Sequence, residues 1–287
     1  MLSREESEVL TRVGPEAPMG RVLRRYWTPA FLAADVPEPD CPPIGVTVLG
    51  EDFVAFRDSS GRLGFLDELC CHRGAPLSYG RVEEGGIRCL YHGWKYDTEG
   101  RILETPNCEN PNVMERVRQG SYPVREAGGV GWVYLGPREH EPPFPHFAYM
   151  DAPAEEISVS EQVYDCNWVQ VQEGSLDSSH IGILHMDNGI VALPLPRRVG
   201  SLEIGGIPWD DVRRPYPEGV PTEDNAPAVH VADTPYGFMY AAVRRMDDPT
   251  KKHVRITSLT FPYTGHIAGS GSSSALFVVP RDDETCS

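Results

Sequence analysis

The chain has 287 residues, of which 40% are hydrophobic and 24% charged, the proportions of an ordinary folded globular protein. This length suffices for two domains with separate cores. The formal net charge of −16 opposes binding to nucleic-acid backbones, because such binding needs basic patches. Residues 1–8 are polar and acidic, and no apolar stretch approaches the length of a membrane span. We therefore expect neither a secretory signal nor insertion into a membrane.

Two short helices are expected within residues 1–28, at Ser7–Leu10 and Arg21–Tyr26. After the proline-rich stretch 36–43, short apolar runs alternate with turn residues, which is typical of a small antiparallel β domain. Residues 58–61, with the sequence Asp-Ser-Ser-Gly, predict a hairpin turn within it. The runs expected to form its strands are 46–49, 53–56, 63–66, 86–88 and 130–135.

The segment 137–145, which contains four prolines, separates this domain from a second one. There, residues 167–180 are the best helix candidate, and the Gly- and Ser-rich residues 265–274 are expected to form a loop. No internal repeat is visible. Its expected strands are 236–243, 255–259 and 275–279. The predicted division is a helical segment 1–28, a first domain 29–145 and a second domain 146–287.

Four of the chain's cysteines and histidines form its most informative pattern. Cys70 and His72 lie in one short segment, Cys89 and His92 in another, and sixteen residues separate the two. A zinc finger usually takes both sulfurs from one segment and both nitrogens from the other. A Rieske 2Fe–2S cluster needs both segments at once, because two cysteines bind one iron and two histidines the other. The alternative is four residues on surface loops that bind zinc adventitiously, or nothing.

The seven cysteines show no regular spacing, which in a reducing cytoplasm indicates cofactor ligands and free thiols rather than disulfides. We therefore expect a cytoplasmic protein. Cys71 adjoins Cys70, and the histidine spacing selects Cys70 as the ligand, although exchanged roles stay open. Gly74 and Pro76 follow the first ligand pair and Gly93 follows the second, so the loops are stiffened by proline and, through glycine, can bring backbone N–H groups close to the cluster sulfurs.

The segments 70–77 and 89–94 resemble the cluster motif of the Rieske non-haem iron oxygenases at every ligand. The resemblance implies an α+β protein, with a small antiparallel β Rieske domain at 29–145 and a catalytic domain of antiparallel sheet and helices, of the helix-grip type, at 146–287. The phthalate dioxygenase branch is the most similar, and its catalytic α subunits form head-to-tail homotrimers. The segments that carry this likeness are 10–15, 18–21, 24–27, 42–43 and 51–57.

A second iron site is predicted by His180 and His185. Non-haem iron oxygenases use two histidines and one carboxylate on one face of a mononuclear Fe(II), leaving open positions for dioxygen and substrate. Five residues of a regular helix exceed one full turn by about 140°, so the helix must end or loosen between these histidines, and Gly182 would allow this. The alternative is two polar residues at a helix end.

Asp177 lies three residues before His180, on the same face of the predicted helix. The segment 173–185 resembles the mononuclear-iron motif of the same oxygenases. That resemblance implies that Asp177 is not a ligand but a residue that carries electrons between the two centres. It would bond a ligand histidine of its own site and His72 or His92 of a neighbouring subunit. The alternative is a solvated charge.

The third, carboxylate ligand of the family lies near the C-terminus, and no counterpart is found in this chain. Asp282 and Asp283 align with a strand inside the family's catalytic domain and are not expected to bind iron. We therefore expect the catalytic domain to lack its C-terminal part, through truncation, a partial gene or a frameshift.

The resemblance implies the oxygenase component of a multicomponent system, with a 2Fe–2S cluster and a mononuclear Fe(II). An NAD(P)H-dependent reductase with flavin and iron–sulfur groups would supply electrons, and O2 would hydroxylate or O-demethylate a small aromatic substrate. Candidate anchors for an aromatic carboxylate are Ser179, Arg244 and Arg245, although surface arginines are the preferred alternative. Two other hypotheses stay open: a Rieske electron-transfer protein and a non-catalytic truncated remnant.

Overall fold

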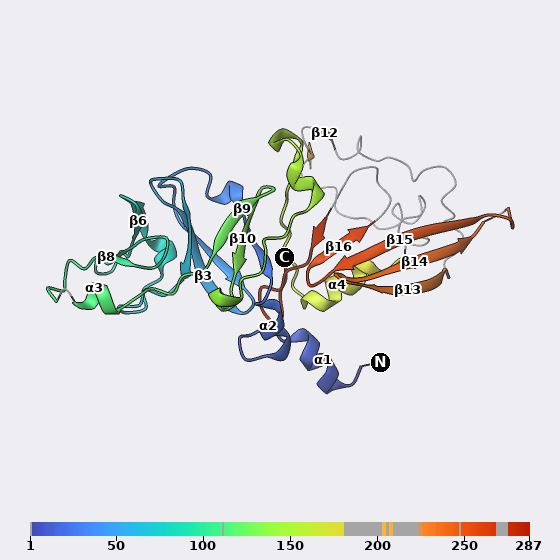
Figure 1. Ribbon diagram of the computed structural model, residues 1–287, viewed down its shortest axis with the longest axis horizontal. Helices are drawn as coiled ribbons and strands as arrows, with labels where there is room; N and C mark the ends of the chain where they lie inside the picture. The colour runs from blue at the N-terminus through green and yellow to red at the C-terminus, as the bar shows by residue number, and fades with distance from the viewer. Residues whose placement is uncertain are drawn as a thin grey trace, which may run out of the picture. The chain divides into compact units, whose positions relative to one another are not determined.

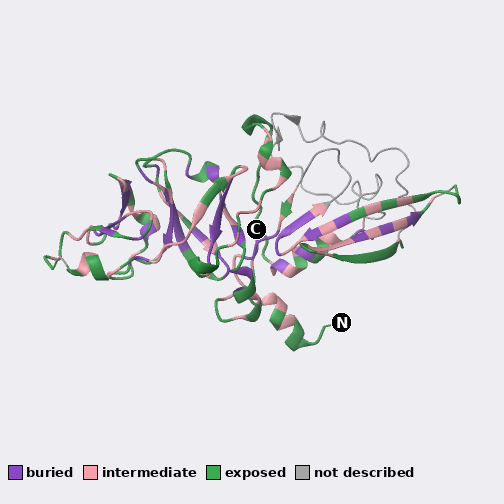
Figure 2. Ribbon diagram, viewed as in Figure 1, coloured by how far each residue is buried: buried purple, intermediate pink, exposed green. Residues whose placement is uncertain are grey.

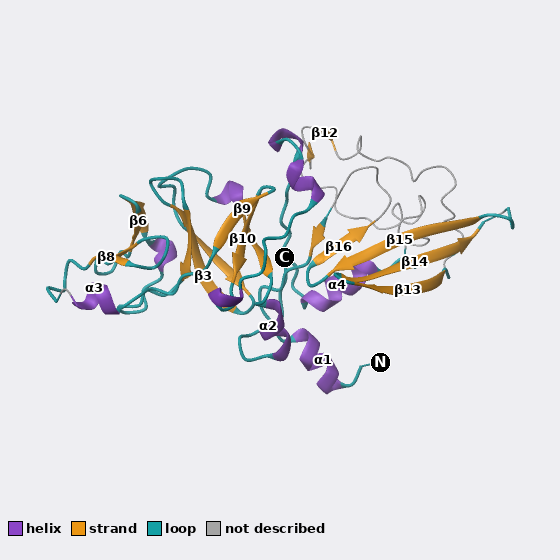
Figure 3. Ribbon diagram, in the orientation of Figure 1, coloured by secondary structure: helices purple, strands orange, loops and turns teal. Residues whose placement is uncertain are grey.

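The computed structural model describes residues 2–110, 112–180, 203–204, 207–208, 224, 226–246, 248–267 and 275–287. The chain divides into two compact units, one formed by residues 1–170 with 278–287 and the other by residues 171–277 (Figure 1). In the described ranges, strands outnumber helices, and the helices are short (Figure 3). None of these helices has the length and apolar character needed to cross a bilayer. His185 and Gly182 lie outside the described residues.

Two helices open the first unit. Helix α1 (Arg4–Thr11) begins at a capping box, in which the Ser3 hydroxyl accepts from the N–H of Glu6 at 3.2 Å and the Glu6 carboxylate accepts from the N–H of Ser3 at 2.7 Å. Helix α2 (Pro18–Leu23) has its proline in the first turn, where the missing N–H costs nothing. The further helix of this unit is α3 (Asn112–Arg116), and its 3₁₀ helices are η1 (Ala33–Asp35), η2 (Leu77–Tyr79), η3 (Arg138–His140), η4 (Ala148–Asp151) and η5 (Ala154–Glu156).

Two antiparallel three-stranded sheets follow, with the strand orders β2-β3-β4 and β1-β10-β9. Phe65 lies between them, with its ring centroid 4.9 Å from that of Phe53 and 6.2 Å from that of Phe31. Buried residues run along both sheets in Figure 2. The expected antiparallel β fold is therefore confirmed. The strands are β1 (Trp27–Leu32), β2 (Ile44–Val48), β3 (Glu51–Arg57), β4 (Leu63–Asp67), β9 (Val124–Ala127) and β10 (Val130–Tyr134).

A third sheet, of four short antiparallel strands, carries the two Cys/His segments. The first segment follows β4, and the second connects β6 to β7. Both cysteines belong to the buried core beneath this sheet, beside Val54, Phe56, Leu66, Leu77, Ile87 and Tyr96. The strands are β5 (Arg81–Glu83), β6 (Gly86–Arg88), β7 (Lys95–Tyr96) and β8 (Ile102–Glu104).

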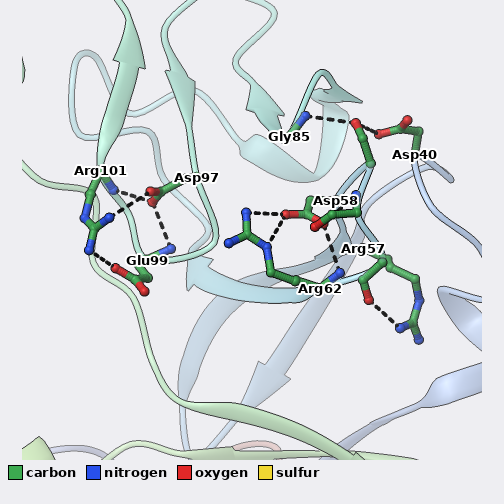
Figure 4. Close-up of polar contacts among 11 residues, drawn as sticks. Asp40, Arg57, Asp58, Arg62, Gly85, Asp97, Glu99 and Arg101 are labelled. Atoms are coloured by element: carbon green, nitrogen blue, oxygen red, sulfur yellow. Dashed lines mark hydrogen bonds and ion pairs between the residues drawn. The ribbon is translucent and has the colours of Figure 1, made fainter.

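One five-residue turn, Asp-x-x-Gly-Arg, occurs twice in this unit, at 58–62 and 97–101 (Figure 4). In each turn the aspartate carboxylate accepts the N–H groups of the third and fifth residues at 2.8 to 2.9 Å. The glycine has φ of +85° in the first turn and +74° in the second, which explains its presence. The hairpin turn predicted from residues 58–61 is thus confirmed.

The second unit contains an antiparallel meander with the strand order β13-β14-β15-β16-β17. The Tyr240 hydroxyl of β14 donates to the carbonyl of Leu176, so the end of helix α4 is bonded to this sheet. Its strands are β13 (Ala228–Thr234), β14 (Gly237–Arg245), β15 (Lys252–Thr260), β16 (Thr264–Ile267) and β17 (Leu276–Phe277), and a separate pair is β11 (Glu203–Ile204) with β12 (Ile207–Pro208).

Helix α4 (Trp168–Leu176) is shorter than expected. The predicted helix 167–180 placed Asp177 and His180 on one helical face, and this is wrong, because both residues follow the end of the helix. The Asp177 carboxylate accepts the N–H groups of Ser179 and His180 at 2.9 and 3.0 Å. Side-chain acceptors of this kind compete with helical bonds, which explains the early end.

Residues 278–287 belong to the first unit. The carbonyl groups of Pro280 and Arg281 accept from the N–H groups of Leu49 and Gly50 at 3.0 and 2.7 Å. The Asp283 carboxylate accepts the N–H of Val13 at 2.8 Å. The first two bonds hold the segment against the loop between β2 and β3, and the third holds it against the loop between α1 and α2.

Candidate metal centres

The structure brings Cys70, His72, Cys89 and His92 together. The two cysteines are each 3% exposed, and both belong to one buried core cluster. The two imidazole rings have centroids 4.8 Å apart and are inclined by 70°. Two sulfurs therefore lie on the buried side and two rings on the half-exposed side.

The two ligand segments have the same backbone geometry. In the first, the N–H of Cys70 donates to Ala75 at 2.9 Å and the carbonyl of Cys70 accepts from Gly74 at 2.8 Å. In the second, Cys89 makes the same two bonds to the residues five and four positions later, at 2.9 and 3.1 Å. The glycines have φ of +68° and +76°, so each loop turns sharply behind its cysteine.

Donors surround both sulfurs. The backbone N–H groups of Tyr91 and His92 act to lower the pKa of the Cys89 thiol, and the hydroxyl of Tyr96 lies 2.9 Å from the sulfur of Cys70. Burial raises the pKa of the Cys89 thiol, against the opposing effect of those N–H donors. Burial also raises the pKa of the Tyr96 hydroxyl, which therefore stays protonated and able to donate to a thiolate. Hydrogen bonds to cluster sulfurs raise the reduction potential.

The histidines are held in orientations suited to metal binding. His72 stacks on Trp94 with centroids 4.4 Å apart and planes 2° apart, and the Trp94 indole N–H donates to Asn107 at 2.8 Å. Burial, the neighbouring His92 and Arg73 lower the pKa of His72, which favours the neutral ring that coordinates metals. The Nδ1 atom of His92 is buried without a hydrogen-bond partner. A buried, unpaired ring nitrogen beside two buried thiols fits a 2Fe–2S cluster.

In a Rieske 2Fe–2S cluster, each iron is bound by only two protein ligands. In the part of the chain that the structure describes, no three His, Cys, Asp or Glu side chains form a group able to hold a single metal ion. Cys71 is exposed, whereas Cys70 is buried next to Cys89. This difference favours Cys70 as the ligand.

The predicted mononuclear site is described only in part. The Asp177 Oδ2 atom lies 2.8 Å from the Nδ1 atom of His180. Burial would raise the pKa of Asp177, but hydrogen bonds from the N–H groups of Ser179 and His180 and from the His180 ring outweigh it, and the pKa lies below its ordinary value. Ser179 itself is exposed. His185, the second histidine of the predicted site, lies outside the described residues.

Arg244 and Arg245 have opposite environments. Arg244 is 2% exposed, and its Nη2 atom donates to the carbonyl and, at 3.2 Å, to the hydroxyl of Ser178. Arg245 is exposed and pairs with Asp224, with an Nη2–Oδ1 distance of 2.9 Å. The expectation of surface arginines is therefore wrong for Arg244 and right for Arg245. Strand β14 alternates its side chains between two faces, which separates the two arginines.

The aspartates near the end of the chain have structural partners. The Asp282 carboxylate accepts the N–H groups of Glu284 and Thr285, at 2.8 and 2.6 Å, and closes a tight turn. The Asp283 carboxylate accepts from Val13, as described above. Both carboxylates thus have bonds that do not involve the candidate iron ligands.

Sequence reasoning missed two residues beside the cluster ligands. Tyr96 was visible only as part of the loop after the second ligand pair. Gln119 had no sequence signal, because its contacts lie some fifty positions earlier in the chain. Its amide oxygen accepts the N–H of Cys71 at 2.8 Å.

Comparison with known proteins agrees with this arrangement. The model of the Rieske [2Fe-2S] domain matches residues 26–123, and that of the LigXa C-terminal domain-like family matches residues 133–287. The chain is 39% identical over 287 residues to the phthalate 4,5-dioxygenase oxygenase subunit of Pseudomonas putida, covering 99% of this chain and 62% of that protein. It is 36% identical over 289 residues to the 3-chlorobenzoate-3,4-dioxygenase oxygenase subunit of Comamonas testosteroni, with the same coverage. The chain thus spans about three-fifths of the length of these relatives.

Among solved structures, NdmA of Pseudomonas putida CBB5 superposes with a TM-score of 0.62 at 22% identity, over 93% of this chain and 72% of that one. Dicamba monooxygenase bound to 3,6-dichlorosalicylic acid gives a TM-score of 0.61 at 17% identity, over 92% and 76%. These likenesses support the fold. By its two matched domains and its relatives, the chain belongs to the Rieske non-haem iron oxygenases. Within that family it falls in the phthalate dioxygenase-like branch of oxygenase subunits.

Proposed function

We propose that this chain is the oxygenase component of a multicomponent Rieske system acting on a small aromatic compound. The observation that carries the proposal is the convergence of Cys70, Cys89, His72 and His92 from two separate hairpins. The family membership supports it, as do the names of the relatives, which are oxygenase subunits.

Cys70 and Cys89 would hold one iron of the cluster, and His72 and His92 the other. A bound 2Fe–2S cluster supplies one-electron transfer. The chain contributes a buried, hydrogen-bonded environment on the sulfur side and half-exposed rings on the histidine side, where a donor can approach. The donor we propose is an NAD(P)H-dependent reductase with flavin and iron–sulfur groups. The exposed apolar residues beside the ligands are Leu69, Leu90 and Tyr91.

We further propose that His180 and His185 bind a mononuclear iron and that Asp177 is the positioning residue between the two centres. Such an iron supplies open positions for dioxygen and substrate. Asp177 holds the Nδ1 side of His180, and its lowered pKa keeps it ionised. In a head-to-tail homotrimer, its carboxylate would also meet a cluster-ligating histidine of the next subunit. No carboxylate ligand is assigned within the chain.

The proposed substrate is an aromatic compound, such as an aromatic carboxylate, that is hydroxylated or O-demethylated. The relatives named for phthalate and chlorobenzoate support a carboxylate, and a 5,5'-dehydrodivanillate O-demethylase subunit is 40% identical over 191 residues. Ser179, next to His180, and Arg244, bonded to Ser178, are the proposed contacts. Arg245 is the weaker candidate, because Asp224 already neutralises it.

Metal and sulfide quantitation tests the proposal. Anaerobically purified protein should contain three iron atoms and two acid-labile sulfides per chain, and dithionite should produce the electron paramagnetic resonance (EPR) signal of a Rieske cluster. Oxygen uptake with a ferredoxin-type reductase should rise on addition of phthalate or a benzoate. Two irons with two sulfides would instead indicate an electron carrier or a non-catalytic remnant. Zinc without sulfide would refute the cluster altogether.

A further inference from the structure

Gln119 is a buried side chain that contacts the first ligand segment but lies outside the cluster motif. It is 2% exposed and is located between α3 and β9. Its Oε1 atom accepts the N–H of Cys71 at 2.8 Å, and its Nε2 atom donates to the carbonyls of Asp67 and Leu69 at 2.8 and 3.0 Å. A glutamine amide offers both an acceptor and two N–H donors, so these three bonds use it almost completely.

The bonds fix the peptide groups on both sides of Cys70. The carbonyl of Leu69 precedes Cys70, the N–H of Cys71 follows it, and Gln119 binds both. The backbone of Cys70 is already bonded within its own hairpin. The path of the chain through this ligand therefore depends on one amide from elsewhere in the sequence.

Gln119 also connects the first ligand segment to the hairpin that follows the second. Its backbone N–H donates to the carbonyl of Gly100 at 3.0 Å, in the turn between β7 and β8. A Cβ atom on Gly100 would lie 2.1 Å from the carbonyl oxygen of Gln119, so the two backbones are in close contact. Strand β7 begins directly after the second ligand segment. The separation of the two segments is thus set partly at this contact.

We propose that Gln119 is a positioning residue of the Rieske cluster that holds its reduction potential down. The inference rests on the proposed function, since it requires the cluster. By accepting the N–H of Cys71, Gln119 keeps that donor from turning toward a cluster sulfur. Backbone donors to sulfur stabilise the reduced, more negative cluster and raise its potential. Loss of the amide would free the N–H of Cys71 to bond a cluster sulfur, and this added donor would shift the potential upward.

The test compares Gln119→Met, which keeps the length without the amide, Gln119→Asn, which keeps a shorter amide, and Ser121→Ala as the matched control. Ser121 donates from the same segment to the carbonyl of Glu99 and makes no bond to a ligand segment. Redox titration followed by EPR should show a higher midpoint potential and shifted g values in Gln119→Met. Gln119→Asn should shift less in the same direction, and Ser121→Ala should match the parent.

Parent potential and parent g values in both Gln119 variants would overturn the inference, even if their melting temperatures fell. If Gln119→Met cannot retain the cluster, the midpoint potential and g values of Gln119→Asn decide whether the inference holds. A parent protein without iron and sulfide would refute the proposed function instead. A parent with the cluster and unchanged variants would refute only the role of Gln119.

Discussion

The Oδ2 atom of Asp177 lies 2.8 Å from the Nδ1 atom of His180, and the same carboxylate accepts the backbone N–H of His180 at 3.0 Å. One side chain therefore fixes both the ring and the main chain of a candidate iron ligand. A carboxylate that holds a ligand histidine sets its tautomer and orientation, and such partners matter almost as much as the ligands.

Asp177→Asn should lower substrate-dependent oxygen uptake by about 10- to 100-fold. Asparagine keeps the shape but removes the negative charge that stabilises the N–H of His180. Cluster content and cluster reduction by dithionite should stay at the parent values, because the residue lies outside the cluster motif. Glu173→Gln, which alters an exposed carboxylate of α4, serves as the control. Parent-like oxygen uptake in Asp177→Asn would exclude the positioning role.

Cys70→Ser and Cys71→Ser should differ sharply. Cys70→Ser should lose the cluster, because the buried sulfur next to Cys89 is removed. Cys71→Ser should keep iron, sulfide and the visible absorption spectrum, because Cys71 is an exposed residue outside the buried core cluster that holds Cys70 and Cys89. Iron and sulfide analysis of both variants checks the assignment. The opposite result would exchange the roles of the two cysteines.

Tyr96→Phe should lower the reduction potential of the cluster while leaving it bound. The Tyr96 hydroxyl lies 2.9 Å from the sulfur of Cys70, and its loss removes a donor that stabilises the reduced state. Redox titration measures the shift. Tyr79→Phe is the control, because the Tyr79 side chain is exposed and lies outside both ligand pairs. A potential equal to that of the parent would show that this hydroxyl does not act on the cluster.

Arg244→Ala and Arg245→Ala should also differ from each other in phthalate binding and in stability. Arg244→Ala should weaken the binding of phthalate and destabilise the fold, because it removes the buried donors to Ser178. Arg245→Ala should bind phthalate as the parent does, since its partner is Asp224. Calorimetric titration of both variants provides the comparison. Unchanged affinity in both would eliminate the arginine anchor.

Asp58→Ala should destabilise the first unit by about 2 kcal/mol, since the carboxylate is fully buried and binds two backbone N–H groups and Arg62. Asp97→Ala, in the matching turn, should cost less, because Asp97 lies 4.0 Å from its arginine and is partly exposed. Chemical denaturation measures both. Equal losses would mean that burial of the ion pair adds nothing.

The pH dependence of the Asp58 contribution follows from its lowered pKa. Burial would raise the pKa of Asp58, but the bonds from Ser60 and Arg62 outweigh it. A depressed folded-state pKa gives a contribution that is complete above the unfolded value, about 3.9, and is lost as the pH falls through the folded value. The stability difference between the parent and Asp58→Ala should therefore be constant at neutral pH and shrink below about pH 4.

The cluster ligands could be predicted because each pair lies within four consecutive residues, where spacing alone limits the chemistry. The antiparallel strands were also visible, because apolar runs alternate with turn residues. Asp177 and His180 were found by motif, but their helical placement was wrong because a local side-chain acceptor ended the helix. Arg244 could not be placed, since the face of a strand depends on its register in a sheet that the sequence does not specify.

Gln119 illustrates the larger limit. Its three side-chain hydrogen bonds join positions about fifty residues apart in the sequence, and no local pattern of composition or periodicity predicts such contacts. The burial of a neutral polar side chain can be predicted only when its hydrogen-bond partners are known.

Each ligand hairpin closes on itself through the same two backbone bonds behind its cysteine. The chain between the hairpins therefore contributes little to the conformation of either one. A change of length in the turn at Glu84 and Gly85 should therefore leave both hairpins closed and remove the bond from the Gly85 N–H to the Ser59 hydroxyl at 2.8 Å, so this turn is a suitable place for attaching a probe or a tether close to the redox centre.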